Sequence, residues 1–322
     1  MTLFRMLVAF AAVALGAAAG QAQNYPSKPI TIIVPAAPGG VTDMLARRLG
    51  PKLTEAWGQQ VIVENRPGAN NRLAAEYVAK AAADGHTILL GPEVTFVVNP
   101  FLYGKLPYDP EKDFAPIVGL IRINHALVVN PSLPVQNVKD LLDLARKKPG
   151  ELNYGTFGVG STGHLNMEML QTLAGVKFTP VHYKGATPAL TDVIAGHIPL
   201  MFVSVGSAVP PAQAGHVKML AIGGARRMAG LPDVPAVAET VPGVEAVSWF
   251  ALFAPSRTPA AVIAKINGEV RRIFDDRDFR EKFLAPQFFE PIAGSPEELA
   301  AYLKSDTEKW RYVLRAANVK LD

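Results

Sequence analysis

Two glycine-rich turns are the parts of this chain with the clearest capacity for chemistry. They are Pro38-Gly39-Gly40-Val41-Thr42 and Gly158-Val159-Gly160-Ser161-Thr162-Gly163, and each follows a strand pattern and precedes a helical pattern. Glycines let backbone N–H groups converge, and the first N–H groups of a helix have no acceptor within the helix. Together with the helix dipole, these donors attract an anion. We predict that two such turns, facing one cleft, bind a ligand with negative charge at one or both ends.

A plainer interpretation of the same residues stays open. Both turns are then ordinary tight turns before capped helices, with Thr42 or Asp43 as the cap of the first helix and Ser161 or Thr162 as the cap of the second. Ser, Thr and Asp are the preferred N-cap residues, so each turn taken alone fits this interpretation.

The patterns of catalytic and cofactor sites are incomplete. Residues 158–163 match G-x-G-x-x-G, but a dinucleotide site also needs an acidic residue about 20 positions later, where the chain has Val181-His182-Tyr183. No nucleophile elbow surrounds Ser161, and His164, three residues later, has no obvious acidic partner. The histidines lack metal-binding spacing and the chain has no cysteine. We predict no catalytic residue, no metal and no cofactor.

Arg72 and four aromatic residues lie at positions where they could contact a ligand. Arg72 could bind a carboxylate through two parallel hydrogen bonds, or it could be a solvated helix residue. The aromatic rings could form the walls of a cleft or pack in the core. They belong to Phe157, Tyr183, Trp249 and Phe250.

The periodicity of apolar residues predicts the elements that position these turns. Predicted strands cover residues 30–34, 60–64, 86–91, 152–154, 179–183 and 198–203, and predicted helices cover 44–49, 74–82, 164–174 and 188–195. Strands that alternate with helices indicate a parallel sheet. The fold class is therefore α/β, with enough material for two lobes.

Two extended segments, 121–130 and 248–255, have the character of strands that cross between lobes. Further helical patterns follow at 259–274, 276–284 and 296–316. If these helices return to the first lobe, lobe 1 comprises residues 23–124 plus 247–322 and lobe 2 comprises residues 125–246. Two crossover strands would form a hinge. Three small domains in a row are the alternative, which the absence of a long polar linker disfavours.

The N-terminal residues 1–22 have the pattern of a cleavable secretory signal peptide. Arg5 precedes an uncharged apolar run, 6–20, and small residues follow it. No later stretch reaches 18 uninterrupted apolar residues, so we expect an exported, soluble protein. The net charge is +4, with both signs mixed along the chain, which gives no indication of nucleic-acid binding.

Many ordered motifs together resemble one known family, the periplasmic solute-binding proteins of tripartite tricarboxylate transporters, which include the Bordetella uptake gene group. The resemblance covers essentially the whole chain after residue 22. It is carried by Tyr25–Ile30 (YPSKPI), Pro35–Asp43 (PAAPGGVTD), Val63–Ala69 (VENRPGA), Ala83–Thr87 (ADGHT), Asn99–Tyr103 (NPFLY), Tyr154–Ser161 (YGTFGVGS), His182–Gly185 (HYKG) and Leu252–Pro255 (LFAP).

The resemblance implies a two-lobed periplasmic binding protein fold that closes on a carboxylate, held largely by backbone groups and ordered waters. In lobe 1 it implies contacts from Ala37, Pro38, Gly39, Gly40 and Thr42. In lobe 2 it implies contacts from Thr156, Phe157, Gly158, Gly160, Ser161 and His164, and from the loop Lys184, Gly185 and Ala186.

Three segments depart from the family pattern. Val203-Ser204 stands where relatives commonly have an acidic residue, Asn70-Asn71-Arg72 replaces small residues, and Gly91–Thr95 replaces a Ser/Thr-rich run. The loss of an acid and the gain of Arg72 favour a second carboxylate on the ligand over an amine, because an unpaired buried charge is costly.

These observations predict a monomeric periplasmic protein that captures a di- or tricarboxylate or an aromatic acid. It would deliver this ligand to the membrane subunits of a tripartite tricarboxylate transporter. A periplasmic sensor for a signalling protein is one alternative, and an exported carboxylate-modifying enzyme is another.

Overall fold

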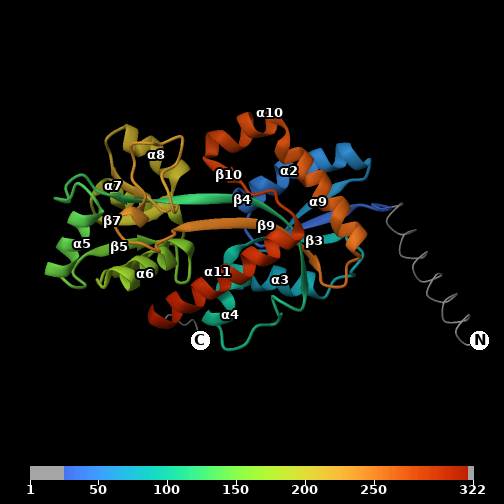
Figure 1. The fold of residues 1–322 in the computed structure, drawn as a ribbon, viewed down its shortest axis with the longest axis horizontal. Coiled ribbons are helices and arrows are strands. Elements are labelled where there is room, and N and C mark those ends of the chain that lie inside the picture. Colours follow the sequence, from blue (N-terminus) through green and yellow to red (C-terminus); the bar gives the residue numbers. More distant parts are fainter. Residues whose placement is uncertain (1–24, 318–322) are drawn as a thin grey trace, which may run out of the picture.

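Two strands lie side by side at the centre of the molecule, between its two lobes (Figure 1). The computed structural model describes residues 25–317, so the predicted signal peptide lies outside the described residues. The strands are β1 Ile30–Val34, β2 Val61–Asn65, β3 Thr87–Pro92, β4 Phe114–Val129, β5 Asn153–Thr156, β6 Thr179–His182, β7 Leu200–Ser204, β8 Lys218–Ile222, β9 Val247–Pro255 and β10 Phe289–Pro291. They form one sheet in the order β2-β1-β3-β9-β4-β7-β5-β6, with β8 and β10 paired to β4.

Helices cover both faces of this sheet (Figure 1). They are α2 Val41–Trp57, α3 Arg72–Ala79, α4 Asn99–Leu102, α5 Val138–Lys147, α6 Thr162–Ala174, α7 Ala186–Ala195, α8 Val205–Gln213, α9 Ala260–Asp275, α10 Arg277–Phe279 and α11 Pro296–Ala317. Short helical turns are η1 Ala69–Asn71, η2 Val94–Val98, η3 Val237–Glu239, η4 Arg280–Leu284 and η5 Ala285–Gln287. Within residues 25–317, no helix is long and apolar enough to cross a membrane.

The strand directions determine where the glycine-rich turns point. In lobe 1, β1 and β3 are parallel to each other, and β3 is antiparallel to β9, which is antiparallel to β4. In lobe 2, β5, β6 and β7 are parallel to one another and antiparallel to β4. The carboxyl end of β1 therefore points toward lobe 2, and the carboxyl end of β5 points toward lobe 1.

All six predicted strands are present, with boundaries shifted by no more than two residues. The crossover strand β4 was predicted to begin at residue 121, but it begins at Phe114. Pro116 and Gly119 interrupt its strand pattern, and the structure accommodates them with irregular register beside each residue. The sequence analysis also missed α8, because Pro210 and Pro211 lie inside that helix.

One hydrophobic cluster is shared by the two lobes. It joins Leu89 and Phe253 of lobe 1 to Leu127 and Leu170 of lobe 2, and Trp249 on β9 lies between them. A second cluster belongs to lobe 1 and a third to lobe 2. The lobes are therefore coupled by apolar packing as well as by the two strands.

Replacing Leu127 by Ala should lower the free energy of unfolding by roughly 2 to 5 kcal/mol, because this fully buried side chain leaves a cavity in the shared cluster. Leu73→Ala is the matched control, since Leu73 is 53% exposed. Denaturant unfolding monitored by circular dichroism measures both. Two separate transitions, of which Leu127→Ala shifts only one, would contradict a core that couples the lobes.

Candidate functional site

The first glycine-rich turn is an exposed connection between β1 and α2. Gly40 is the N-cap residue of α2 and no side chain caps this helix, so the interpretation in which Thr42 or Asp43 is the cap is wrong. Gly39 has a φ of 90°, and a Cβ added there would meet nothing within 4 Å. Ala37 and Pro38 are exposed, whereas the side chain of Thr42 is buried. The turn thus presents backbone donors and open space.

Asp43 fixes the conformation of this turn from inside. Its carboxylate accepts hydrogen bonds from the Gly39 N–H at 2.9 Å, from Asn65 Nδ2 at 2.9 Å and from Arg47 Nε at 2.9 to 3.0 Å. Asn65 Nδ2 also donates to the Ala36 carbonyl. Chiefly through the hydrogen bond from Arg47, the pKa of Asp43 falls to about 2. Sequence analysis considered Asp43 only as a cap and missed this anchoring role.

The second turn, between β5 and α6, is held by its own side chains. The Gly158 N–H donates to Thr156 Oγ1 at 3.2 Å, and Thr156 Oγ1 lies 2.7 Å from His182 Nδ1. Ser161 is the N-cap residue of α6 and accepts from the His164 N–H, so the capping interpretation is confirmed for this residue. Gly158 and Gly160 have φ values of 130° and 71°, a region that glycine adopts readily.

His164 lies behind the second turn. Its side chain is buried, and Nδ1 accepts a hydrogen bond from the Gly160 N–H at 3.1 Å. Burial, helped by His182, lowers the pKa of His164 to about 4, so the ring is neutral at pH 7. A neutral ring can accept this hydrogen bond, and His164 therefore positions the turn. Its direct contact with a ligand stays a prediction.

The third predicted loop, Lys184-Gly185-Ala186, connects β6 to α7. Gly185 is the N-cap residue of α7, has a φ of 140°, and leaves the helix without a side-chain cap. Lys184 is exposed. Because β6 pairs in parallel with β5, this loop emerges at the same edge of the sheet as the second turn.

Arg72 and two of the aromatic residues have partners elsewhere. The Arg72 guanidinium lies 3.8 Å from the centre of the Tyr103 ring, and Nε donates to the Ala69 carbonyl at 3.0 Å. Trp249 and Phe250 are buried in the core, where packing rather than a cleft wall accounts for them. The Phe157 ring packs against Gly163, at the start of α6.

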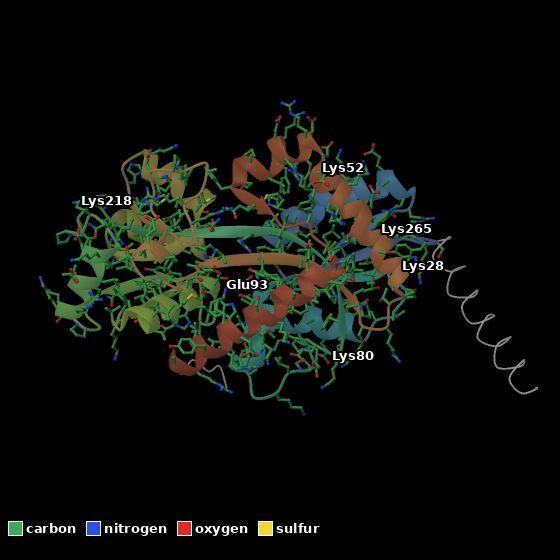
Figure 2. All side chains as sticks on the ribbon, in the orientation of Figure 1. Lys28, Lys52, Lys80, Glu93, Lys218 and Lys265 are labelled. Atoms are coloured by element: carbon green, nitrogen blue, oxygen red, sulfur yellow. The ribbon has the colours of Figure 1, made fainter. Side chains whose placement is uncertain are left out.

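Glu93 joins the two lobes where β3 ends. Only 1% of this residue is exposed, and its carboxyl group accepts hydrogen bonds from Thr162 Oγ1 at 3.1 Å and from the Trp249 N–H at 3.3 Å. Thr162 begins α6, so the contact reaches from lobe 1 to the helix after the second turn. Figure 2 shows Glu93 at the centre of the molecule, between the lobes. Burial, with a further contribution from Asp306, raises the pKa of Glu93 to about 7.

Glu93 is the functional candidate that sequence analysis missed. Residues 91–95 stood out only as a departure from a family pattern, and nothing in the sequence brings Glu93 next to Thr162. Within residues 25–317, no hydrogen bond or ion pair joins the first turn directly to the second. The same residues contain no group of three or more acidic or histidine side chains arranged to hold a metal ion.

Comparison with known proteins decides the family. The model of the tripartite tricarboxylate transporter family receptor matches residues 45–319. The chain belongs to this receptor family. The resemblance seen in the sequence motifs is thereby confirmed, and so is the two-lobed α/β fold.

Relatives and solved structures agree with this assignment. A UPF0065 protein of Bordetella bronchiseptica is 36% identical over 315 residues, which cover 98% of this chain and 93% of the relative. An R. palustris protein solved with adipate is 36% identical, with a TM-score of 0.81 over 92% of this chain and 100% of the other. MatC from Rhodopseudomonas palustris, solved with bound malate, is 31% identical, with a TM-score of 0.77 over 90% of this chain and 100% of the other.

Replacing Glu93 by Gln should change how stability depends on pH. The folded-state pKa of about 7 lies above the ordinary value of 4.5, so the folded protein holds a proton that the unfolded chain loses. The wild-type carboxyl group therefore costs stability as pH rises from 4.5 to 7. The stability of the variant relative to wild type should increase between pH 5 and pH 8, by at most about 3 kcal/mol.

Urea unfolding of both proteins at the two pH values measures this difference. The free energy of unfolding of the wild type is subtracted from that of the variant. This subtraction cancels the titration of His125 and His164, whose pKa values burial lowers to about 4. If the variant loses a hydrogen bond, the difference in free energy of unfolding changes by the same amount at every pH. A pH-independent difference would show that Glu93 is ionised in the folded protein throughout this range.

Proposed function

We propose that this protein captures a small carboxylate between its lobes and delivers it to the membrane subunits of a tripartite tricarboxylate transporter. It would do so in the periplasm, as a monomer, and without catalysis. Membership of the receptor family supports the receptor role. Adipate and malate, found in two solved relatives, are both dicarboxylates and indicate the class of ligand.

The observation that carries this proposal is the opposed direction of β1 and β5. It points the turn before α2 at lobe 2, and it points the turns before α6 and α7 at lobe 1. Gly40 and Gly185 leave the first N–H groups of α2 and α7 without side-chain acceptors. Unpaired N–H groups at helix starts favour an anion, and in this proposal those of both lobes face one cleft.

Ligand contacts in this proposal come from the three turns. Gly39, Gly40 and Gly158 let the ligand approach the backbone closely, and Lys184 adds a positive charge at the rim of the cleft. The remaining contacts of lobe 1 come from Ala37, Pro38 and Thr42, and those of lobe 2 from Thr156, Phe157, Gly160, Ser161, Gly185 and Ala186. Arg72 reaches the ligand only if its guanidinium leaves the Tyr103 ring.

The proposed hinge lies in β4 and β9, with lobe 2 spanning residues 125–246. Between Asn124 and His125, β4 exchanges its pairing with β9 for pairing with β7. A ligand that bridges the lobes stabilises the closed state by its differential affinity for that state. The membrane subunits then recognise the closed form.

Substitution of Gly39 or Gly158 by Val should abolish binding of a dicarboxylate. The added side chain occupies the space that the anion needs, and both positions have positive φ. Gly58→Val is the matched control, because Gly58 lies at the opposite end of α2 with a φ of 66° and open space around its Cβ. All three variants place a β-branched residue at a positive φ, and only two of them lie at the proposed cleft.

Thermal shift with adipate and malate measures the outcome. Ligand at about 100 times its dissociation constant adds about 2.7 kcal/mol to the stability of the wild type and of Gly58→Val. Gly39→Val and Gly158→Val should show no shift. Equal shifts in all four proteins would place the ligand elsewhere, and tight binding of zwitterionic amino acids alone at this cleft would overturn the dicarboxylate class.

A further inference from the structure

A cavity of about 780 Å³ lies beside the crossover strands, and none of the residues of the three turns lines it. Its walls come from both lobes. Arg122 and Asn124 of β4 and Glu290 of β10 form one part, and the loop 224–232 after β8 forms another. The volume falls in the range of small-molecule sites, about 300 to 1,000 Å³.

Two arginines on these walls have hydrogen-bond donors to spare. Arg226 is exposed and has no hydrogen bond or ion pair with any residue from 25 to 317. Arg122 has a buried Nε without an acceptor. Arg227, in contrast, is neutralised by Glu239, which accepts two hydrogen bonds of 2.9 Å from its guanidinium. The Arg122 guanidinium lies 5.6 Å from the centre of the Tyr302 ring, and Arg122 also lines the cavity.

The acidic residue nearest to Arg122 in the sheet does not supply that acceptor. Glu290 lies directly opposite Arg122 in the pairing of β10 with β4, yet no ion pair of 4.0 Å or less joins them. Instead, Glu290 Oε1 accepts from Asn124 Nδ2 at 2.9 Å. The guanidinium of Arg122 and the carboxylate of Glu290 therefore stay unpaired with each other, although both residues line the cavity.

Two carboxylates balance the two available guanidiniums. Glu290 is one, and Glu245 is the other, with its nearest cation, Lys309, at 3.7 Å. Met228 and Val247 add apolar surface to the same cavity. A cavity with two available cations, two carboxylates and an apolar wall complements a neutral, dipolar molecule with an apolar body.

We propose that this cavity binds a small zwitterion of the amino-acid type. The ligand's carboxylate accepts hydrogen bonds from Arg122 and Arg226, its ammonium group donates to Glu245 and Glu290, and its side chain packs on Met228 and Val247. This second site is separate from the carboxylate cleft. Because its walls come from both lobes, an occupant also favours the lobe arrangement that brings those walls together.

The probe for this site is L-leucine, with two analogues that each lack one charge. 4-Methylpentanoate lacks the ammonium group and 3-methylbutylamine lacks the carboxylate. In isothermal titration calorimetry, leucine should bind with an affinity at least roughly tenfold higher than either analogue, because each analogue leaves charged groups of the cavity unpaired. Equal affinity for leucine and 4-methylpentanoate would overturn the zwitterion proposal.

Two variants test the location. Arg226→Gln should weaken leucine binding at least roughly tenfold without altering thermal stability, since this side chain has no described partner. Arg257→Gln is the matched control, because Arg257 is also exposed but follows the opposite end of β9. Leucine affinity should be unchanged in Arg257→Gln. Unchanged affinity in Arg226→Gln as well would overturn the assignment to this cavity.

A third measurement separates the two proposed sites. In Gly39→Val, leucine should still bind, whether or not adipate binds to the wild type in the cleft. Leucine and adipate should also bind the wild type together. Loss of leucine binding in Gly39→Val, or no heat at millimolar leucine, would overturn the second site and leave the carboxylate proposal unaffected.

Discussion

The pairing of β4 with β9 is the constraint on which the rest of this structure depends. Each strand belongs to the path between the lobes, and their antiparallel alignment sets the direction of every strand added on either side. Parallel neighbours in lobe 1 consequently end toward lobe 2, and those in lobe 2 end toward lobe 1. The helix starts that follow β1 in lobe 1 and β5 in lobe 2 therefore point toward the opposite lobe.

The two glycine-rich turns are preorganised by buried polar side chains. Asp43 holds the first turn through the Gly39 N–H, and His164 holds the second through the Gly160 N–H. Each side chain satisfies one N–H donor of its turn, and in the proposed function the helix start is left to interact with the ligand. Binding then loses little conformational entropy, because the turn does not have to be ordered by the ligand.

Charged groups are also placed where the lobes meet. Glu93 is buried between β3, β9 and α6, and Arg122 directs an unsatisfied N–H into the protein beside the crossover strands. Burial of such groups is expensive unless they are paired or neutral. A change in the relative position of the lobes alters the surroundings of both residues, so both are expected to respond to closure.

The sequence by itself determined the local elements and the class of chemistry. The β-branched run of β1, the glycines before α2 and α7, and Ser161 before α6 are local signals, because strand preference, positive φ and capping depend on near neighbours in the chain. The cap of α5 is an equally local signal, since Asn137 accepts from the Asp140 N–H. The two-lobed class and the prediction that the glycine-rich turns bind an anion followed from such patterns and from the motifs of the family.

Only the tertiary structure decided which distant residues share an environment. Glu93 meets Thr162 across 69 positions of the chain, and Asp43 meets Asn65 across 22. The cavity beside the crossover strands collects residues from β4, β9, β10 and the loop after β8. It also buried Trp249 and Phe250 in the core and turned Arg72 toward Tyr103. These outcomes depend on strand order and on packing between the lobes. Because they arise from contacts between segments far apart in the chain, the periodicity within a single segment does not encode them.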